Sequence, residues 1–258
     1  MEMERRASGL SDQGKRENNE DRFLLFNHER MGRYLFIGAV ADGAGAHSAG
    51  EVASENTVRL LNEWISERHL DIYDMPPDDL KNEMYDKILD IHQELKKIRA
   101  EKKIDKFGTT LTLFLLLDNR YIIAQVGDSR AYIYNEGKRI KQITRDQTKA
   151  QQEREKQAFL YGEELKEKES IILQGLGYGS VVPQIYEGIL PEQYVILLCS
   201  DGLSNKLLCE DFEKAIAKKD DGACMKEILK FMMDEAIRKG ESDNMTGILY
   251  CRQSHQTN

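Results

Sequence analysis

The stretch YLFIGAVADG (34–43) is an apolar run that ends in an acid and a glycine. The same pattern returns as YIIAQVGDS (121–129) and as YVILLCSDG (194–202). Asp243 and Asn244 come in the opposite order, just before the apolar run MTGILY (245–250). An apolar run bounded by an acid and a glycine predicts a buried strand that delivers the acid to the edge of a sheet.

Several of these acids are predicted to converge. Glu20 and Asp21 lead into a further strand-like run, RFLLF (22–26), and so join Asp42, Asp201 and Asp243. A lone Asp is usually a turn or capping residue, so the prediction depends on the joint pattern. Carboxylates that are buried together repel one another, and a bound cation is the simplest relief of that repulsion. Because the ligands would all be oxygen atoms, the cation should be Mg²⁺ or Mn²⁺.

Hairpin signals favour antiparallel sheets. Two apolar runs, at 111–117 and 121–126, flank the turn residues DNR (118–120), and a second pair of runs, at 130–134 and 139–144, flanks NEGK. Residues 7–27 and 33–41 are also predicted as strands. Strands at the centre with helices outside them predict an α+β fold rather than a parallel α/β fold.

Three segments have the apolar spacing of helices. The first covers 49–66, and the second follows the break at Pro76 and Pro77. The stripe of the second helix contains Leu80, Met84, Ile88, Ile91, Leu95 and Ile98, and that of the third contains Met225, Ile228, Leu229, Met232, Ala236 and Ile237. The helices are expected in two pairs, one between the strands and one near the C-terminus. The highly charged segment 146–170 is predicted as either a helix or a mobile surface flap.

Composition limits the class of protein. The chain has 258 residues, which suits a single sheet-rich domain over 1–258. Its net charge of −8 argues against binding to nucleic acid or to an anionic membrane. The N-terminal residues lack the apolar segment of a signal peptide, and the longest apolar run is too short to span a bilayer. The four cysteines have no CxxC spacing, so we expect free thiols in a cytoplasmic protein rather than a zinc site.

Eight short blocks occur in an order and spacing that resemble one family. They are SDQGKRENNED (11–21), ADG (41–43), GEVAS (50–54), GTT (108–110), VGDSRAY (126–132), ITRD (143–146), CSDGL (199–203) and SDNMT (242–246). Together they resemble the metal-dependent protein phosphatases of type 2C, particularly the small bacterial ones. The resemblance runs almost from end to end. It implies an antiparallel β-sandwich flanked by helix pairs, in four αββα layers, with a metal pair at one edge.

The resemblance also assigns the metal ligands. Asp42 would bridge two tightly bound Mn²⁺ or Mg²⁺ ions. Asp201 and Asp243 would hold the first ion with it, while Asp21 and the Gly43 carbonyl would bind the second.

Four further residues receive roles from the resemblance. Glu20 would act on the second metal through water, and Asp128 would share a third, weaker ion with Asp201. Arg16 matches the phosphate-binding arginine of the family. Asn244 would support the acids without touching the metals.

These residue types suit hydrolysis of phosphoserine and phosphothreonine in proteins. A metal pair activates water for direct attack on phosphorus, and the planar guanidinium of Arg16 suits a phosphate. Asp42 and Asp201 are therefore the expected catalytic residues together with Arg16. A cysteine-dependent mechanism needs a Cys-x5-Arg loop, which the sequence lacks. The expected partners are phosphorylated proteins that a serine/threonine kinase has modified, and the enzyme should be a monomer.

Two departures from the family pattern concern the proton donor and the flap. Eukaryotic members have a histidine after the Asp-Gly pair, which many bacterial relatives lack. This chain has Ala44 there, so the general acid stays open between His47 and a metal-bound water. Asp146 is followed by Gln147 and Thr148, where the family often has His and Ser. We interpret this second difference as variation in the flap.

Two other functions were considered. A phosphatase-like fold without activity could serve as a binding or sensing module, but such a module would be expected to lack metal acids, and all of them are present here. A metal-dependent hydrolase of small phosphoesters or nucleotides is the second alternative. Assays on a phosphopeptide and on a nucleotide separate these possibilities.

Overall fold

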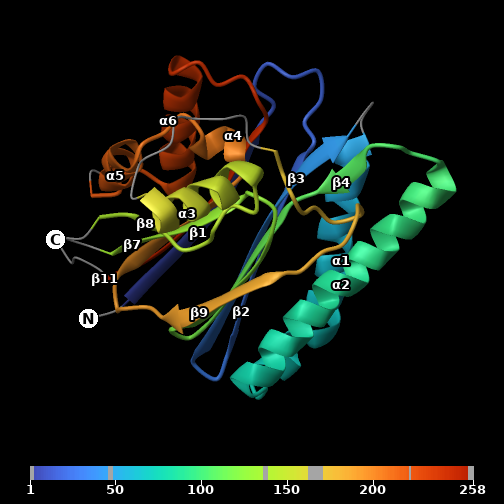
Figure 1. The fold of residues 1–258 in the computed structure, drawn as a ribbon. Coiled ribbons are helices and arrows are strands. Elements are labelled where there is room, and N and C mark those ends of the chain that lie inside the picture. The colour runs from blue at the N-terminus through green and yellow to red at the C-terminus, as the bar shows by residue number, and fades with distance from the viewer. Residues whose placement is uncertain (1–2, 46–48, 136–138, 162–170, 221, 255–258) are drawn as a thin grey trace.

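The protein forms two antiparallel sheets that pack face to face, with helices on both outer surfaces (Figure 1). The computed structural model describes residues 3–45, 49–135, 139–161, 171–220 and 222–254. The four layers confirm the predicted α+β sandwich with helix pairs outside it. Among the described residues, no helix is both long and apolar enough to cross a membrane.

Each sheet is assembled from strands that are far apart in the chain. The first sheet has the order β1 (Met3–Asp12), β11 (Met245–Ser254), β10 (Tyr194–Cys199), β7 (Arg130–Asn135) and β8 (Lys141–Gln142). The second has the order β2 (Asp21–Arg30), β3 (Arg33–Gly45), β5 (Leu111–Leu117), β6 (Arg120–Val126) and β9 (Gln184–Ile189). The short strand β4 (Phe107–Thr109) pairs with the end of β3.

The helices cover the sheets in pairs. Helices α1 (Ala49–Ile72) and α2 (Pro77–Lys102) lie together on one side of the sandwich, and α5 (Cys209–Ala217) and α6 (Met225–Arg238) lie on the other (Figure 1). Pro77 occupies the first turn of α2, where its missing N–H is not needed. Two shorter helices are α3 (Lys149–Tyr161) and α4 (Asp201–Ser204).

Three apolar clusters explain why the central strands are apolar on both faces. Between the sheets, Phe36 and Phe114 pack with Ile196, Leu198 and Tyr250. The alternate side chains of the same strands face the helices instead: Leu35 and Ile37 pack in the cluster that includes α1 and α2. Val195 and Leu197 pack in the cluster that includes α5 and α6.

Several sequence-based boundaries were wrong. Residues 7–27 are not one strand, because the loop 13–20 separates β1 from β2 and carries the chain from one sheet to the other. Gly14 has φ +61° in that loop, and its N–H is held by Asp12 Oδ1 at 2.9 Å. The first helix continues to Ile72, and the strand expected at 139–144 is reduced to β8. Strand β9 and helices α4 and α5 were not located by the sequence.

The charged segment 146–170 contains helix α3 over Lys149–Tyr161. This agrees with the helical alternative for that part of the segment. Residues 162–170 and the turn at 136–138 lie outside the described part of the chain.

A candidate metal and phosphate site

Five aspartates come together at one edge of the sandwich, as predicted from the ends of the apolar runs. Asp21 begins β2 and Asp42 lies near the end of β3, and the two are direct partners in the register of the sheet. Asp201 starts α4 directly after β10. Asp243 precedes β11, and Asp128 follows β6. Antiparallel order explains the meeting, because the end of one strand lies beside the start of its neighbour.

The cluster carries more negative charge than its surroundings neutralise. Burial, followed by repulsion from Asp201 and Asp243, raises the pKa of Asp21 to about 7 despite a hydrogen bond from Ser200. Burial and repulsion from Asp201 also raise the pKa of Asp128 to about 7. The pKa of Asp42 lies well above its ordinary value, because the half-buried group is desolvated and is repelled by Asp21 and Asp201. Buried carboxylates in this state favour protons or metal cations.

Asp128 contributes the clearest single sign of a cation-binding position. Its side chain is 2% exposed, and its Oδ1 atom is buried without any hydrogen-bond partner among the described residues. An unpartnered buried carboxylate oxygen is costly, and a cation would satisfy it. The loop that carries Asp128 is tied to β3, since Ser129 Oγ lies 2.7 Å from Thr110 Oγ1, which accepts the N–H of Asp42 at 3.0 Å.

Ser200 joins the two sheets at the acid cluster. Its Oγ donates to Asp21 Oδ2 at 2.8 Å and accepts the N–H of Thr246 at 2.9 Å. Asp21 belongs to one sheet, while Thr246 belongs to the other and Ser200 follows β10 of that second sheet. Ser200 is therefore in direct contact with a metal-ligand candidate.

Asn244 holds the loop 13–20 against the start of β11. Its Nδ2 donates to the carbonyls of Gln13 and Asn18, at 2.8 and 2.9 Å, and its Oδ1 accepts the N–H of Glu20 at 2.9 Å. These bonds use both amide hydrogens and one acceptor position of the oxygen. Asn244 therefore positions Glu20 and the neighbouring Asp243.

Gly43 is required by the close approach of three backbone segments. A Cβ atom at this position would lie 2.3 Å from the Gly50 carbonyl oxygen and 2.7 Å from that of Glu20. No side chain fits such a gap, so the chain can pass beside the start of α1 only with a glycine at position 43. This closeness holds the Asp42 backbone near Glu20.

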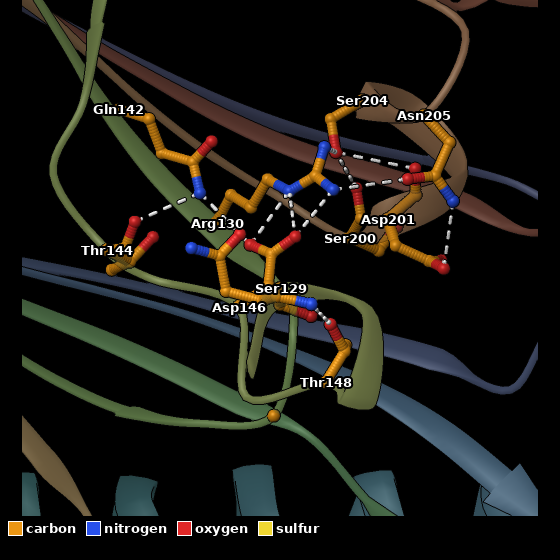
Figure 2. A network of polar contacts seen from close by, with 12 residues as sticks. Ser129, Arg130, Gln142, Thr144, Asp146, Thr148, Ser200, Asp201, Ser204 and Asn205 are labelled. Carbon is orange, nitrogen blue, oxygen red and sulfur yellow. Dashed lines mark hydrogen bonds and ion pairs between the residues drawn. The ribbon is translucent and has the colours of Figure 1, made fainter. Parts of the chain in front are cut away.

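An arginine network positions Asp201, and the sequence did not identify it as part of the site (Figure 2). Arg130 Nε and Nη2 donate to Asp146 at 2.7–3.1 Å, and Nη1 donates to Ser204 Oγ at 3.0 Å. Nη2 also reaches Asn205 Oδ1 at 3.3 Å, and Asn205 in turn donates to Asp201 Oδ2 at 3.0 Å. Burial alone would lower the pKa of Arg130, but the bonds with Asp146 raise it well above its ordinary value. Arg130 therefore stays charged.

Part of the acid cluster lines a cleft of about 570 Å³, whose lining residues do not include Asp21 and Asp128. Arg16 lies at this cleft and is about half exposed, and its Nη2 donates to Asp243 Oδ2 at 2.7 Å. The hydrogen bond to Asp243 raises the pKa of Arg16. The remaining lining residues are Glu17, Asn18, Glu20, Asp42, Gly43, Ala44, Gly45, Ile172, Asp201 and Asn244. An exposed guanidinium beside buried acids suits an anion that is bound together with metal ions.

The donor set fits a hard divalent cation. The available donors are oxygen atoms of Asp side chains and of the backbone. Among the described residues, no three acidic, histidine or cysteine side chains already surround one metal position. Asp243 is paired with Arg16, so its carboxylate would have to turn away from the arginine to bind a metal. Ala44 lines the cleft and offers no proton donor, and His47 lies outside the described residues.

Residues 8–239 match the protein phosphatase 2C family. The chain belongs to this family. The serine/threonine phosphatase Stp of Listeria monocytogenes serotype 4b is 28% identical over 97% of both chains. The serine/threonine protein phosphatase PstP of Mycobacterium tuberculosis is 31% identical over 95% of this chain and 44% of PstP.

Solved structures of two similar proteins share the fold. The serine/threonine phosphatase of S. agalactiae superposes with a TM-score of 0.80 at 28% identity, covering 96% of this chain and 99% of that one. The catalytic domain of PstP in complex with two manganese ions superposes with a TM-score of 0.76 at 28% identity, covering 98% and 100%. The four-layer sandwich is therefore the fold of the family.

Proposed function

We propose that this 2C-family protein hydrolyses phosphoserine and phosphothreonine in proteins, with divalent metal ions held by the aspartate cluster. The observation that carries the proposal is the cluster of buried and half-buried aspartates with raised pKa values, two of which, Asp42 and Asp201, line a cleft together with Arg16. Family membership and similarity to serine/threonine phosphatases support the same activity. One catalytic domain would span 1–258.

The ligand assignment follows the positions of the acids. Asp42 is repelled by both Asp21 and Asp201, so it lies near each of them and would be the ligand shared by the two ions. Asp201 and Asp243 would complete the first site, and Asp21 with the Gly43 carbonyl the second. Two Mn²⁺ ions are named for the similar PstP structure, which supports Mn²⁺ here, with Mg²⁺ as the other hard candidate.

Two more acids would act around that pair. Glu20 would contribute through water, since its backbone is held beside Gly43. Asp128, with its unpartnered Oδ1, would share a third and weaker ion with Asp201.

Metal ions bound at this cluster would neutralise phosphoryl oxygens and lower the pKa of an attacking water molecule. The chain itself supplies orientation and charge. Arg16 binds the phosphoryl group through its planar fork, and the Arg130–Asn205 chain fixes the direction of the Asp201 carboxylate. Burial of the carboxyl groups favours their protonated forms, so the acids would be ionised at neutral pH only when cations balance their charge.

A cysteine nucleophile does not suit the site. Cys199 is the cysteine nearest to Asp201 in the chain, and burial raises its pKa to about 12, so it is a thiol at neutral pH. Hydrolysis without a covalent enzyme intermediate is therefore the proposed route. Phosphoproteins modified by a serine/threonine kinase are the proposed substrates, and a cytoplasmic monomer stays a prediction.

The test combines one pair of variants with three substrates: a phosphothreonine peptide, p-nitrophenyl phosphate and a nucleotide. The purified protein should hydrolyse a phosphothreonine peptide and p-nitrophenyl phosphate with Mn²⁺, and a chelator should abolish both activities. Asp42→Asn should lower kcat at least about a hundredfold. Asp86→Asn, which changes an exposed acid on α2, should leave kcat unchanged.

Each alternative has its own outcome. Tight binding of a phosphopeptide without turnover would indicate a binding module, and faster hydrolysis of nucleotides than of the peptide would indicate a small phosphoester hydrolase. Equal activity in chelator, or a normal kcat in Asp42→Asn, would refute the metal assignment.

A further inference from the structure

A second groove, of about 430 Å³, continues from the catalytic cleft. The two hollows share Ala44, Gly45 and Ile172 in their walls, so they form one continuous depression. The second groove is bounded by the 105–110 segment, which includes β4, and by the chain at 172–178 that leads towards β9. Figure 1 shows this chain passing beside the ends of β3 and β4.

Exposed apolar side chains are concentrated at this groove. Ile172, Leu173 and Tyr178 line it and are 38%, 48% and 60% exposed. Among the described residues, eleven large apolar side chains are exposed, and five of them lie between 171 and 182. Scattered exposed apolar residues need no explanation, but a concentration of them around a hollow marks a binding surface.

The backbone of this segment is held firmly although its side chains are exposed. The N–H of Leu173 donates to the Gln147 carbonyl at 2.8 Å, and Leu176 exchanges two backbone hydrogen bonds with Thr109, at 2.8 and 3.2 Å. The N–H of Gly177 donates to His92 Nδ1 at 3.1 Å. The apolar side chains are thus presented by an ordered wall, which lowers the entropic cost of binding against them.

The charged residues of the groove leave its apolar character unchanged. Arg99 is already engaged, because it donates to the carbonyls of Ile104 and Asp105 at 3.1 and 2.8 Å and lies 5.0 Å over the Tyr178 ring. Lys106 and Asp105 line the same end and carry opposite charges. The three charged lining residues give the groove a net charge of only +1, which does not select a strongly acidic or basic ligand.

We propose that this groove binds an apolar side chain close in sequence to the phosphorylated residue of a polypeptide substrate. The proposal rests on the phosphatase function proposed above. The occupant is a polypeptide because the groove and the phosphate-binding cleft are continuous, so a ligand that fills both must carry its phosphate and its apolar group on one chain. Since the groove opens on one side of the cleft, the preferred apolar residue lies on one side of the phosphoresidue.

The test is a scan of phosphothreonine peptides with alanine at the three positions on either side of the phosphoresidue. Leucine is introduced at one position at a time, and kcat/KM is measured with Mn²⁺. We expect at least one position on one side to raise kcat/KM about tenfold, mainly through KM, and the other side to have no effect. A flat scan would overturn the proposal.

Matched variants connect the preference to the groove. Leu173→Ser should remove most of the gain from leucine while leaving hydrolysis of p-nitrophenyl phosphate unchanged, because that substrate is too small to reach the groove. Val182→Ser is the control, since Val182 is 59% exposed in the same segment but does not line the groove. An equal loss in both variants would refute the assignment.

Failure of the phosphatase function would be recognised separately. In that case the wild type would hydrolyse none of the peptides and no p-nitrophenyl phosphate. Fluorescence anisotropy of labelled peptides then still decides about the groove, because the leucine peptide should bind the wild type about tenfold more tightly than the alanine peptide. Equal binding of the two peptides would overturn the inference.

Discussion

Replacing Arg130 with Met should destabilise the protein and loosen its metal site. The guanidinium makes three contacts of 2.7–3.1 Å with Asp146, and the two side chains are only 19% and 13% exposed. Removal of one partner from a buried ion pair costs about 3–5 kcal/mol, because the other charge remains buried and unpaired. The residual exposure of both groups places the expected loss near the lower end, about 3 kcal/mol.

Urea unfolding in chelator measures this loss, and a shift of about 6–12 °C in Tm should accompany it. Arg59→Met is the matched control. It breaks an ion pair with Glu63 in which both side chains are about half exposed, so it should cost less than about 1 kcal/mol. Arg130→Met with Asp146→Leu should recover much of the stability, because no unpaired charge remains.

The second measurement is Mn²⁺ binding by calorimetry. Arg130→Met removes the partner of Asn205, which holds Asp201 Oδ2, so Mn²⁺ affinity should fall about tenfold or more. Asp146→Leu alone should be destabilising as well, since it leaves Arg130 charged without its carboxylate. A stability loss in Arg130→Met no larger than that in Arg59→Met would refute the reasoning.

Three further predictions concern individual acids and Arg16. The pKa of Asp21 is raised to about 7 in the metal-free protein. The protonated Asp21 side chain therefore contributes fully to stability below its ordinary pKa near 4, and this contribution is lost as the pH rises through about 7. In chelator, the Tm of the wild type should therefore fall relative to that of Asp21→Asn across this range, and parallel pH profiles would contradict the prediction. Arg16→Ala should raise KM and lower kcat, while calorimetry should find Mn²⁺ binding nearly intact. Arg16→Lys should restore activity only partly, because lysine lacks the bidentate fork. Loss of Mn²⁺ binding in Arg16→Ala would show instead that Arg16 organises the acids. Asp128→Ala should slow the phosphopeptide more than p-nitrophenyl phosphate, whose leaving group needs less protonation, whereas an earlier melt with proportional loss of both activities would show a structural role.

The sequence alone determined the identity of the candidate acids and the type of most central elements. Apolar runs such as 34–41 and 194–199 are buried on both faces, so their unbroken apolar composition is sufficient to predict that they are buried. Helix α6 shows its buried stripe at helical spacing for the same reason. The short blocks around Asp42, Asp201 and Asp243 were sufficient to indicate the family.

Other features depended on contacts between distant parts of the chain. Whether 7–27 forms one strand or two is decided by the loop 13–20, whose Lys15 N–H donates to the Ser242 carbonyl at 3.0 Å. No pattern within residues 7–27 predicts that Ser242 is the hydrogen-bond partner. The Ser200–Asp21 bond likewise joins residues 179 positions apart, in different sheets.

The arginine network and the apolar groove also depend on contacts between distant parts of the chain. Arg130 reaches Asp146, Ser204 and Asn205 because β7 lies beside β10 in the sheet, and the groove exists because the 172–178 segment pairs with Thr109. A local pattern reports how each residue is buried, but it does not report which strand becomes its neighbour. The order of strands in the two sheets is fixed by the packing of the whole chain, so only the tertiary structure decided which residues support the acids and where a substrate would extend.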